Sequence, residues 1–339
     1  MPSLVQTTLR NATRKPNEPI NILTFPTHER YQSNLSKTGQ NFYLWQGEGI
    51  KPWRSDYAKV PSGTVLLNPE NGSNQIPPEI DIDLVLSQNK FGQFDIARQI
   101  AGQLSVPLVS IEHTLPMESW NTQQLQQLYN MRGDVNIFIS EYSRRKWGWG
   151  YEEALVIHHG IDSFDFCPDE KVKKERVALS VVNDWINRDW CCGFNLWRQT
   201  TGYPESHFPV NVLGDTPGLS ESAKSTEELI GTYRKSLVFL NTSLISPVPT
   251  SLLEAMSCGC AVVSTATCMI PEIIENGKNG YISNDPNELR GFVQKLLDNE
   301  ELAIEMGKNA RQTILEDFSL NDFVSKWNQI FYGVINEQS

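Results

Sequence analysis

The segment Pro249–Ser264, which reads PTSLLEAMSCGCAVVS, contains signals for a helix start, a helix end and a buried strand in close succession. Thr250 or Ser251 can cap a helix, Gly259 can end it, and Ala261–Ser264 is typical of a strand buried on both faces. A helix that begins at the carboxyl end of a parallel strand points its free backbone N–H groups and the positive end of its dipole at that edge of the sheet. The segment therefore predicts an α/β fold with a diphosphate site at a helix start.

Glu254 stands one turn into the predicted helix, and it is surrounded in the sequence by apolar residues. A carboxylate in that position can accept two hydrogen bonds from the hydroxyls of a ribose. The alternative is an exposed helix residue. However, no Lys or Arg follows at four residues to pair with it, so the sequence favours a ribose-binding role.

Short apolar runs alternate with helix-like stretches along the rest of the chain, which is typical of βαβ units in doubly wound parallel sheets. The predicted strands are Ile20–Phe25, Thr64–Leu67, Leu84–Leu86, Leu108–Ile111, Val135–Ile139, Val177–Val182, Val210–Leu213, Leu237–Leu240 and Ala261–Ser264. The predicted helices are Phe94–Leu104, Thr122–Arg132, Leu252–Ser257, Asn287–Asp298 and, from its helical spacing of apolar residues, the stretch Leu302–Ile335.

A change of pattern after Val156–Asp162 divides the 339 residues into two predicted domains, because the chain becomes charged and proline-bearing before the alternation restarts. We predict a mobile N-terminal arm over residues 1–19, a Rossmann-like domain over 20–160, a second over 161–318 and a C-terminal helix over 319–339. Two such domains imply a cleft between them.

Composition and charge exclude several classes of function. The net charge is −11, and nucleic-acid binding requires a basic surface. No apolar run reaches the roughly 20 residues of a spanning helix, and the first residues lack the apolar block of a signal peptide, so we expect a cytoplasmic protein without peripheral membrane contact. The six cysteines lack the spacing of a disulfide framework or a zinc site, which favours reduced thiols.

The helix and strand of the opening segment, continued through Ile270–Tyr281, resemble the donor-binding region of retaining glycosyltransferases of the GT-B fold, especially family 4 (glycosyl transferases group 1). Val156–Asp162, Phe166–Pro168 and Glu316–Phe331 resemble further pieces of that family in the same order. The likeness is strong from residue 156 to 333 and weak before it. The resemblance implies two Rossmann-like domains facing a cleft, with the C-terminal helix crossing back to the first.

The resemblance also implies an activity. It is the transfer of a hexose from a UDP- or GDP-sugar to a carbohydrate, lipid-linked or protein acceptor, with retention of anomeric configuration. Since helix N–H groups and an arginine can neutralise the diphosphate, and the sequence holds no credible metal cluster, we expect no metal or other cofactor to be required.

Individual residues carry over by the same resemblance. Glu254 matches the glutamate that binds the ribose, and Thr250, Ser251 and Leu252 match the turn at the diphosphate. Arg188 matches an arginine that stabilises the departing phosphates, although an exposed loop arginine beside Asp189 is the alternative. We also assign Gly214, which follows a predicted strand, to the donor site.

Two positions depart from the family pattern. Ser246 replaces a glutamate that contacts the donor sugar, and Cys192 replaces a lysine. Both changes remove charge, so the donor identity and the catalytic rate are open. A catalytically silent protein that binds nucleotide sugars or glycans, and a sugar-nucleotide epimerase, remain alternative functions.

His113 follows the predicted strand Leu108–Ile111, at the edge where open α/β sheets bind ligands. It resembles a family histidine that contacts the transferred sugar, and a structural histidine is the alternative. The tryptophans Trp185, Trp190 and Trp197 can pack in a core or stack on a base, and the sequence leaves both roles open.

Overall fold

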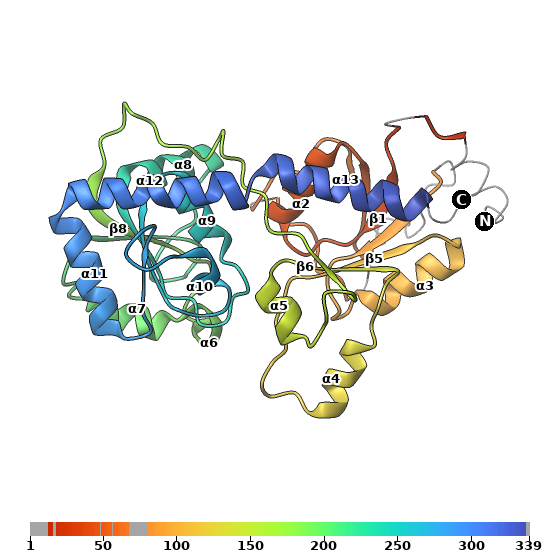
Figure 1. Ribbon diagram of the computed structural model, residues 1–339, viewed down its shortest axis with the longest axis horizontal. Coiled ribbons are helices and arrows are strands. Elements are labelled where there is room, and N and C mark those ends of the chain that lie inside the picture. The colour runs from red at the N-terminus through yellow and green to blue at the C-terminus, as the bar shows by residue number, and fades with distance from the viewer. Residues whose placement is uncertain (1–12, 16–17, 48, 56, 68–79, 337–339) are drawn as a thin grey trace. The chain divides into compact units, whose positions relative to one another are not determined.

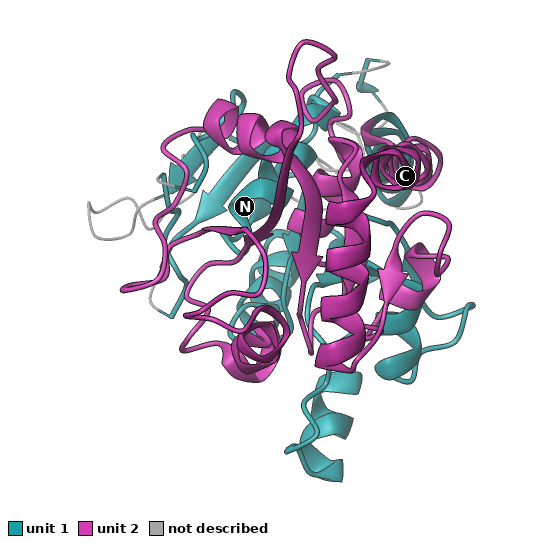
Figure 2. Ribbon diagram, turned by 90° about the vertical axis from the view of Figure 1, so that its left-hand side faces the viewer, with its two compact units in different colours: residues 1–160, 321–339 teal, residues 161–320 magenta. Residues whose placement is uncertain are grey.

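The computed structural model describes residues 13–15, 18–47, 49–55, 57–67 and 80–336 of the chain. The chain divides into two compact units, one made of residues 1–160 with 321–339 and the other of residues 161–320 (Figure 2). Each unit contains its own parallel sheet with helices packed on it (Figure 1).

In the first unit, the described residues form a sheet of seven parallel strands in the order β3-β2-β1-β4-β5-β6-β7. Every residue of β4 and β5 is buried, as expected for strands covered on both faces. The strand order reverses between β1 and β4, which is the switch point of this sheet. The strands are β1 (Asn21–Thr24), β2 (Asn41–Trp45), β3 (Thr64–Leu67), β4 (Leu84–Ser87), β5 (Leu108–Glu112), β6 (Val135–Phe138) and β7 (Leu155–Val156).

The helices of the first unit include one from the far end of the chain, since residues 321–339 cluster with residues 1–160. Apolar residues at helical spacing bury one face of that helix, α13, and the indole of Trp327 donates a hydrogen bond to the hydroxyl of Tyr31 at 3.1 Å. The helices of this unit are α2 (Glu29–Leu35), the 3₁₀ helix η1 (Ser36–Thr38), α3 (Phe94–Leu104), α4 (Thr122–Tyr129), α5 (Glu141–Lys146) and α13 (Leu320–Asn336).

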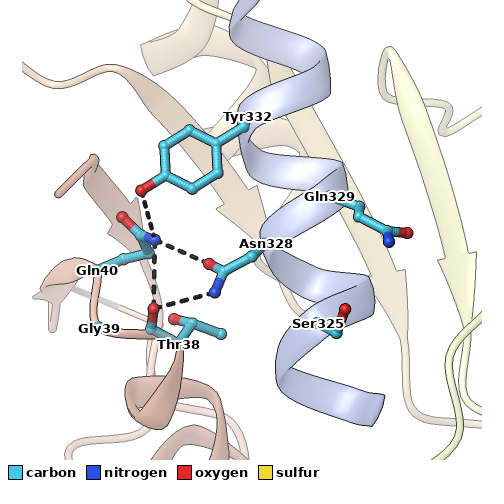
Figure 3. A pocket seen from close by; sticks show the side chains of 7 residues that line it. All are labelled: Thr38, Gly39, Gln40, Ser325, Asn328, Gln329 and Tyr332. Carbon is cyan, nitrogen blue, oxygen red and sulfur yellow. Dashed lines mark hydrogen bonds between the residues drawn. The ribbon is translucent and has the colours of Figure 1, made fainter. Parts of the chain in front are cut away.

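A polar hollow lies between η1 and α13 (Figure 3). The Nε2 of Gln40 donates to the Oδ1 of Asn328 at 2.8 Å and to the hydroxyl of Tyr332 at 3.3 Å, and Asn328 donates to the carbonyl of Thr38 at 3.2 Å. These polar atoms bond to one another, so they hold α13 against the amino end of β2.

In the second unit, the described residues form five parallel strands in the order β12-β11-β10-β8-β9. The order reverses between β8 and β10, which is the switch point of this sheet. The strands are β8 (Glu175–Val181), β9 (Val210–Leu213), β10 (Ser236–Asn241), β11 (Ala261–Ser264) and β12 (Tyr281–Ile282).

The helices of the second unit pack on this sheet. α7 and α11 contribute to one apolar cluster with the strands, and there the fully buried Trp185 and Trp197 lie with ring centroids 4.9 Å apart. These two tryptophans are therefore core residues, whereas Trp190 is exposed. The helices are α6 (Asp189–Cys192), α7 (Phe194–Thr201), α8 (Thr226–Lys235), α9 (Thr250–Ser257), α10 (Ile270–Ile273), α11 (Pro286–Asp298) and α12 (Glu300–Asp317).

Each predicted strand corresponds to an observed strand, with ends shifted by one or two residues at most. The stretch Leu302–Ile335 forms α12 and α13, as its spacing predicted. The sequence did not predict β2 or the short β12.

The arm predicted over residues 1–19 lies mostly outside the described residues. In its described part, the guanidinium of Arg14 forms an ion pair with Asp83, and that carboxylate also accepts the backbone N–H of Asn21 at 2.8 Å. Arg14 is therefore bonded to the first unit.

None of the described helices is both long enough and apolar enough to cross a membrane.

Candidate functional site

The switch point of the second sheet brings together the loop that follows β8 and the turn that follows β10. The backbone N–H groups of Leu244 and Ile245, in the turn after β10, donate to the carbonyl of Cys191 at 2.8 and 3.0 Å. Gly193 has φ +67°, and a Cβ there would collide with the carbonyl of Thr242, so only glycine allows this approach. The two segments are thus joined backbone to backbone at the edge where α/β sheets bind ligands.

Helix α9 begins in this turn, at Thr250. Its N-cap is Pro249, with φ −69°, and no side chain caps it, so the predicted capping by Thr250 or Ser251 is wrong. Proline fixes a suitable φ and leads directly into the first turn. Because the N–H of Leu252 already donates to the carbonyl of Pro249 at 3.1 Å, the N–H groups of the two preceding residues are the ones that remain without an intrahelical acceptor.

Glu254 lies on the same face of α9 as Thr250 and Ser251, since residues three and four apart are neighbours on a helix. Its side chain is 4% exposed, and its Oε2 accepts a hydrogen bond from the hydroxyl of Tyr233 at 3.0 Å. The alternative of an exposed helix residue is therefore wrong. A glutamate side chain leans toward the N-terminus of its helix, which directs this carboxylate toward the turn after β10.

Arg188 lies in the loop after β8, where it is exposed and forms the N-cap of α6. Its Nη1 contacts the carbonyl of Asn183 at 3.4 Å, and its own carbonyl accepts the N–H groups of Cys191 and Cys192. The backbone is thus fixed while the guanidinium remains exposed to solvent. Cys192, at the position of the family lysine, is buried and supplies no charge.

Ser246 and Gly214 flank these elements. Ser246 is half-buried in the turn between β10 and α9. Gly214 directly follows β9 with φ +127°, and a Cβ there would collide with the carbonyl of Val182. Since the N–H of Gly214 donates to the carbonyl of Glu221 at 3.0 Å, close backbone packing already accounts for this glycine.

His113 belongs to the first unit, whereas the other predicted site residues belong to the second. It follows β5 and lies edge-on against Tyr31, with ring centroids 4.5 Å apart. Its Nε2 is buried without a hydrogen-bond partner among the described residues. Burial, reinforced by His159 and His28, holds the pKa of this imidazole well below its usual value, so the ring is neutral at pH 7.

The turn that carries His113 is fixed by Glu112. This buried carboxylate accepts the backbone N–H of Lys90 at 3.0 Å and both the N–H and the hydroxyl of Thr114 at 2.8 and 2.7 Å. Burial raises the pKa of Glu112, although these hydrogen bonds oppose the shift. The histidine is therefore held by a well-bonded neighbour, and its buried Nε2 has no hydrogen-bond partner among the described residues.

Sequence reasoning missed two features of this site. Tyr233, at the end of α8, reaches Glu254 from 21 positions earlier in the chain. The contact of Cys191 with the turn after β10 joins residues more than 50 positions apart. Neither has a local sequence signal. In the described residues, no group of three or more His, Cys, Asp or Glu side chains is arranged to hold a metal ion.

Comparison with known proteins connects this geometry to one family. A family profile described as Glycosyl transferases group 1 matches residues 222–313, a range that includes the turn after β10 and all of α9. Glycosyltransferase MJ1069 of Methanocaldococcus jannaschii, described as uncharacterized, is 30% identical over an alignment 302 positions long that covers 76% of this chain and 77% of that protein. N-acetyl-alpha-D-glucosaminyl L-malate synthase of Bacillus anthracis is 36% identical over 88 residues, only 25% of this chain and 23% of that protein.

A solved structure has the same fold. HepE of Anabaena, whose crystal structure is a complex with UDP, superposes with a TM-score of 0.72 at 15% identity, covering 93% of this chain and 100% of that one. This likeness confirms the predicted GT-B fold.

Proposed function

Because the chain belongs to the glycosyl transferases group 1, we propose that it transfers a hexose from a nucleotide diphosphate sugar to an acceptor, without a metal ion and with retention of anomeric configuration. The observation that carries the proposal is the arrangement at the switch point of the second sheet. There the turn that leads into α9 and the loop bearing Arg188 are joined through the carbonyl of Cys191.

Each predicted donor contact has a chemical role in this proposal. The N–H groups of Thr250 and Ser251 bind the diphosphate together with the dipole of α9, and Glu254 accepts hydrogen bonds from the ribose hydroxyls. Ser246 faces the donor sugar. Gly214 follows β9 and lets the backbone pack closely on Val182 after β8, so its role at the donor site is to support the loop after β8.

Two residues have catalytic roles in this proposal. The exposed guanidinium of Arg188 stabilises the charge that develops on the diphosphate as the glycosidic bond breaks. The neutral imidazole of His113 uses its unpartnered Nε2 as a hydrogen-bond partner for a hydroxyl of the transferred sugar. Its depressed pKa supports this role, because a neutral ring does not repel a positive charge that develops at the anomeric carbon.

UDP-sugars are the first donors to test, since the related fold of HepE is described in complex with UDP, and GDP-sugars are the second. Calorimetric titration with UDP and with GDP, in the presence of a chelator, measures nucleotide binding directly. Incubation with a panel of UDP- and GDP-hexoses and with carbohydrate, lipid-linked and protein acceptors then measures nucleotide release. The anomeric configuration of the product is read by proton magnetic resonance.

The alternatives give different outcomes in the same assays. A binding protein without catalysis binds a nucleotide sugar and releases no nucleotide with any acceptor. An epimerase converts the sugar without an acceptor. Failure of both UDP and GDP to bind would refute the proposed donor site, and inversion at the anomeric carbon would refute retention alone.

A further inference from the structure

Two adjacent thiols lie in the segment that joins the loop after β8 to the turn after β10. The Sγ atoms of Cys191 and Cys192 are 3.6 Å apart at the end of α6. The two residues are 5% and 8% exposed, and neither is in a disulfide. Because both residues are only slightly exposed, a very small reagent reaches the thiols more readily than a protein does.

The two sulfurs lie close enough to share a hydrogen bond in which either can be the donor, and the Sγ of Cys191 also lies 3.4 Å from the carbonyl of Arg188. The hydrogen bond with Cys192 and the guanidinium of Arg188 lower the pKa of Cys191, although burial opposes the shift. The same hydrogen bond and burial raise the pKa of Cys192. Because the thiolate is the form that reacts with oxidants, these shifts favour Cys191 as the sulfur that reacts first.

We propose that Cys191 and Cys192 are a modification site for hydrogen peroxide, at which oxidation to a disulfide between the adjacent residues releases the turn after β10 and weakens nucleotide binding. The inference concerns regulation of the donor site, so its last step rests on the proposed function. Disulfide formation and release of the turn do not depend on that function.

The chemistry is balanced. The thiolate of Cys191 attacks one oxygen of the peroxide, the O–O bond breaks, and hydroxide leaves to give a sulfenic acid on Cys191. The sulfur of Cys192 then attacks the sulfenic sulfur and expels the second hydroxide. The two thiol protons convert both hydroxides to water, so two thiols and one peroxide become one disulfide and two waters.

Disulfide formation changes the backbone, because adjacent residues are a poor match for the bond. Cα atoms are about 3.8 Å apart across a trans peptide, whereas disulfides usually join Cα atoms roughly 4.4 to 6.8 Å apart. The sulfurs must also approach from 3.6 Å to about 2.05 Å. The peptide between the two cysteines, which contains the Cys191 carbonyl, must therefore rotate out of its helical geometry.

That carbonyl accepts the N–H groups of both Leu244 and Ile245, and the next carbonyl, of Cys192, accepts the indole N–H of Trp185 at 2.8 Å. Rotation of the peptide breaks the two bonds that fix the turn leading to Ser246 and α9. The N-terminus of α9 then loses its fixed position relative to the loop of Arg188, so affinity for a nucleotide diphosphate falls.

The experiment treats the reduced protein with a small excess of hydrogen peroxide, blocks remaining thiols with an alkylating reagent and analyses peptides by mass spectrometry. We expect the peptide with Cys191 and Cys192 to lose about two mass units and to escape alkylation. Hydrogen exchange should become faster at Leu244 and Ile245, UDP affinity should fall at least tenfold, and dithiothreitol should restore both.

Variants separate this pair from the other thiols. Cys191→Ser cannot form the bond, so its exchange rates and UDP affinity should not respond to peroxide. Cys268→Ser removes another thiol near the same turn, with its Sγ 3.7 Å from the carbonyl of Leu244, and should respond as the parent does. Circular dichroism checks that each variant is folded.

The outcomes are distinct. Absence of the bond, or an unchanged exchange rate at Leu244 and Ile245 after it forms, would overturn the inference. An equal loss of affinity in the parent and in Cys191→Ser would also overturn it. If the bond forms and exchange accelerates but the reduced protein binds neither UDP nor GDP, the proposed donor site fails while the peroxide-sensitive turn stands.

Discussion

Replacement of Glu254 by glutamine keeps the size and the helix propensity of the side chain and removes its charge. The carboxylate is buried and accepts a hydrogen bond from Tyr233, and a carboxylate has enough lone pairs to accept hydrogen bonds from a ribose diol as well. A hydrogen bond to a charged group contributes about 1.5 to 3 kcal/mol, against about 0.5 to 1.5 for a neutral pair. Glu254→Gln should therefore weaken nucleotide binding by about 1 to 3 kcal/mol, which is about 5- to 150-fold.

Calorimetric titration of UDP and GDP into the parent and the variant measures this loss, and thermal melting measures the effect on the fold. Glutamine retains an oxygen that can accept the Tyr233 hydroxyl, so we expect little change in melting temperature. Tyr233→Phe is the matched control, because it removes that hydrogen bond, at a cost of about 1 kcal/mol of stability, and leaves the carboxylate charge in place. Unchanged affinity in a folded Glu254→Gln protein would show that the ribose does not bind here.

Three further predictions test other features. Ser246→Glu should change the affinity for a sugar nucleotide severalfold and the affinity for the nucleotide diphosphate by less than about 0.5 kcal/mol. The reason is that only the sugar is expected to reach this residue. Equal effects on both ligands would show that Ser246 does not contact the sugar. Nucleotide affinity should be the same with and without a chelator, because backbone N–H groups and Arg188 are expected to neutralise the diphosphate. Loss of the binding isotherm on chelation would contradict metal independence. Burial, with smaller contributions from His28 and His158, lowers the pKa of His159 from about 6.5 to about 3. Below pH 6.5 the unfolded chain therefore takes up a proton at this residue that the folded protein does not. For this residue the free energy of unfolding should be about 2 kcal/mol smaller at pH 5 than at pH 7, and urea titrations should show a weaker pH dependence for His159→Gln than for the parent.

The second half of the chain illustrates why most of its strands could be predicted from the sequence. Ala261–Ser264 is almost entirely apolar, all of its residues are buried, and it is a strand with the predicted bounds. Parallel strands covered on both faces need continuous apolar runs, which leave a local trace in the sequence. β2, which also has a continuous run of aromatic and apolar residues after Asn41, was missed.

The sequence by itself determined most of the strands and the position of a helix directly after a strand in the opening segment, because short-range patterns encode these features, and the family resemblance supplied the roles of the candidate residues Glu254, Arg188 and His113. Only the tertiary structure decided that Glu254 is buried against Tyr233, that no side chain caps α9, and that the carbonyl of Cys191 holds the turn after β10. Each of the two contacts joins distant parts of the chain. The sequence pattern cannot specify such contacts, because they depend on which strands become neighbours when the sheet forms.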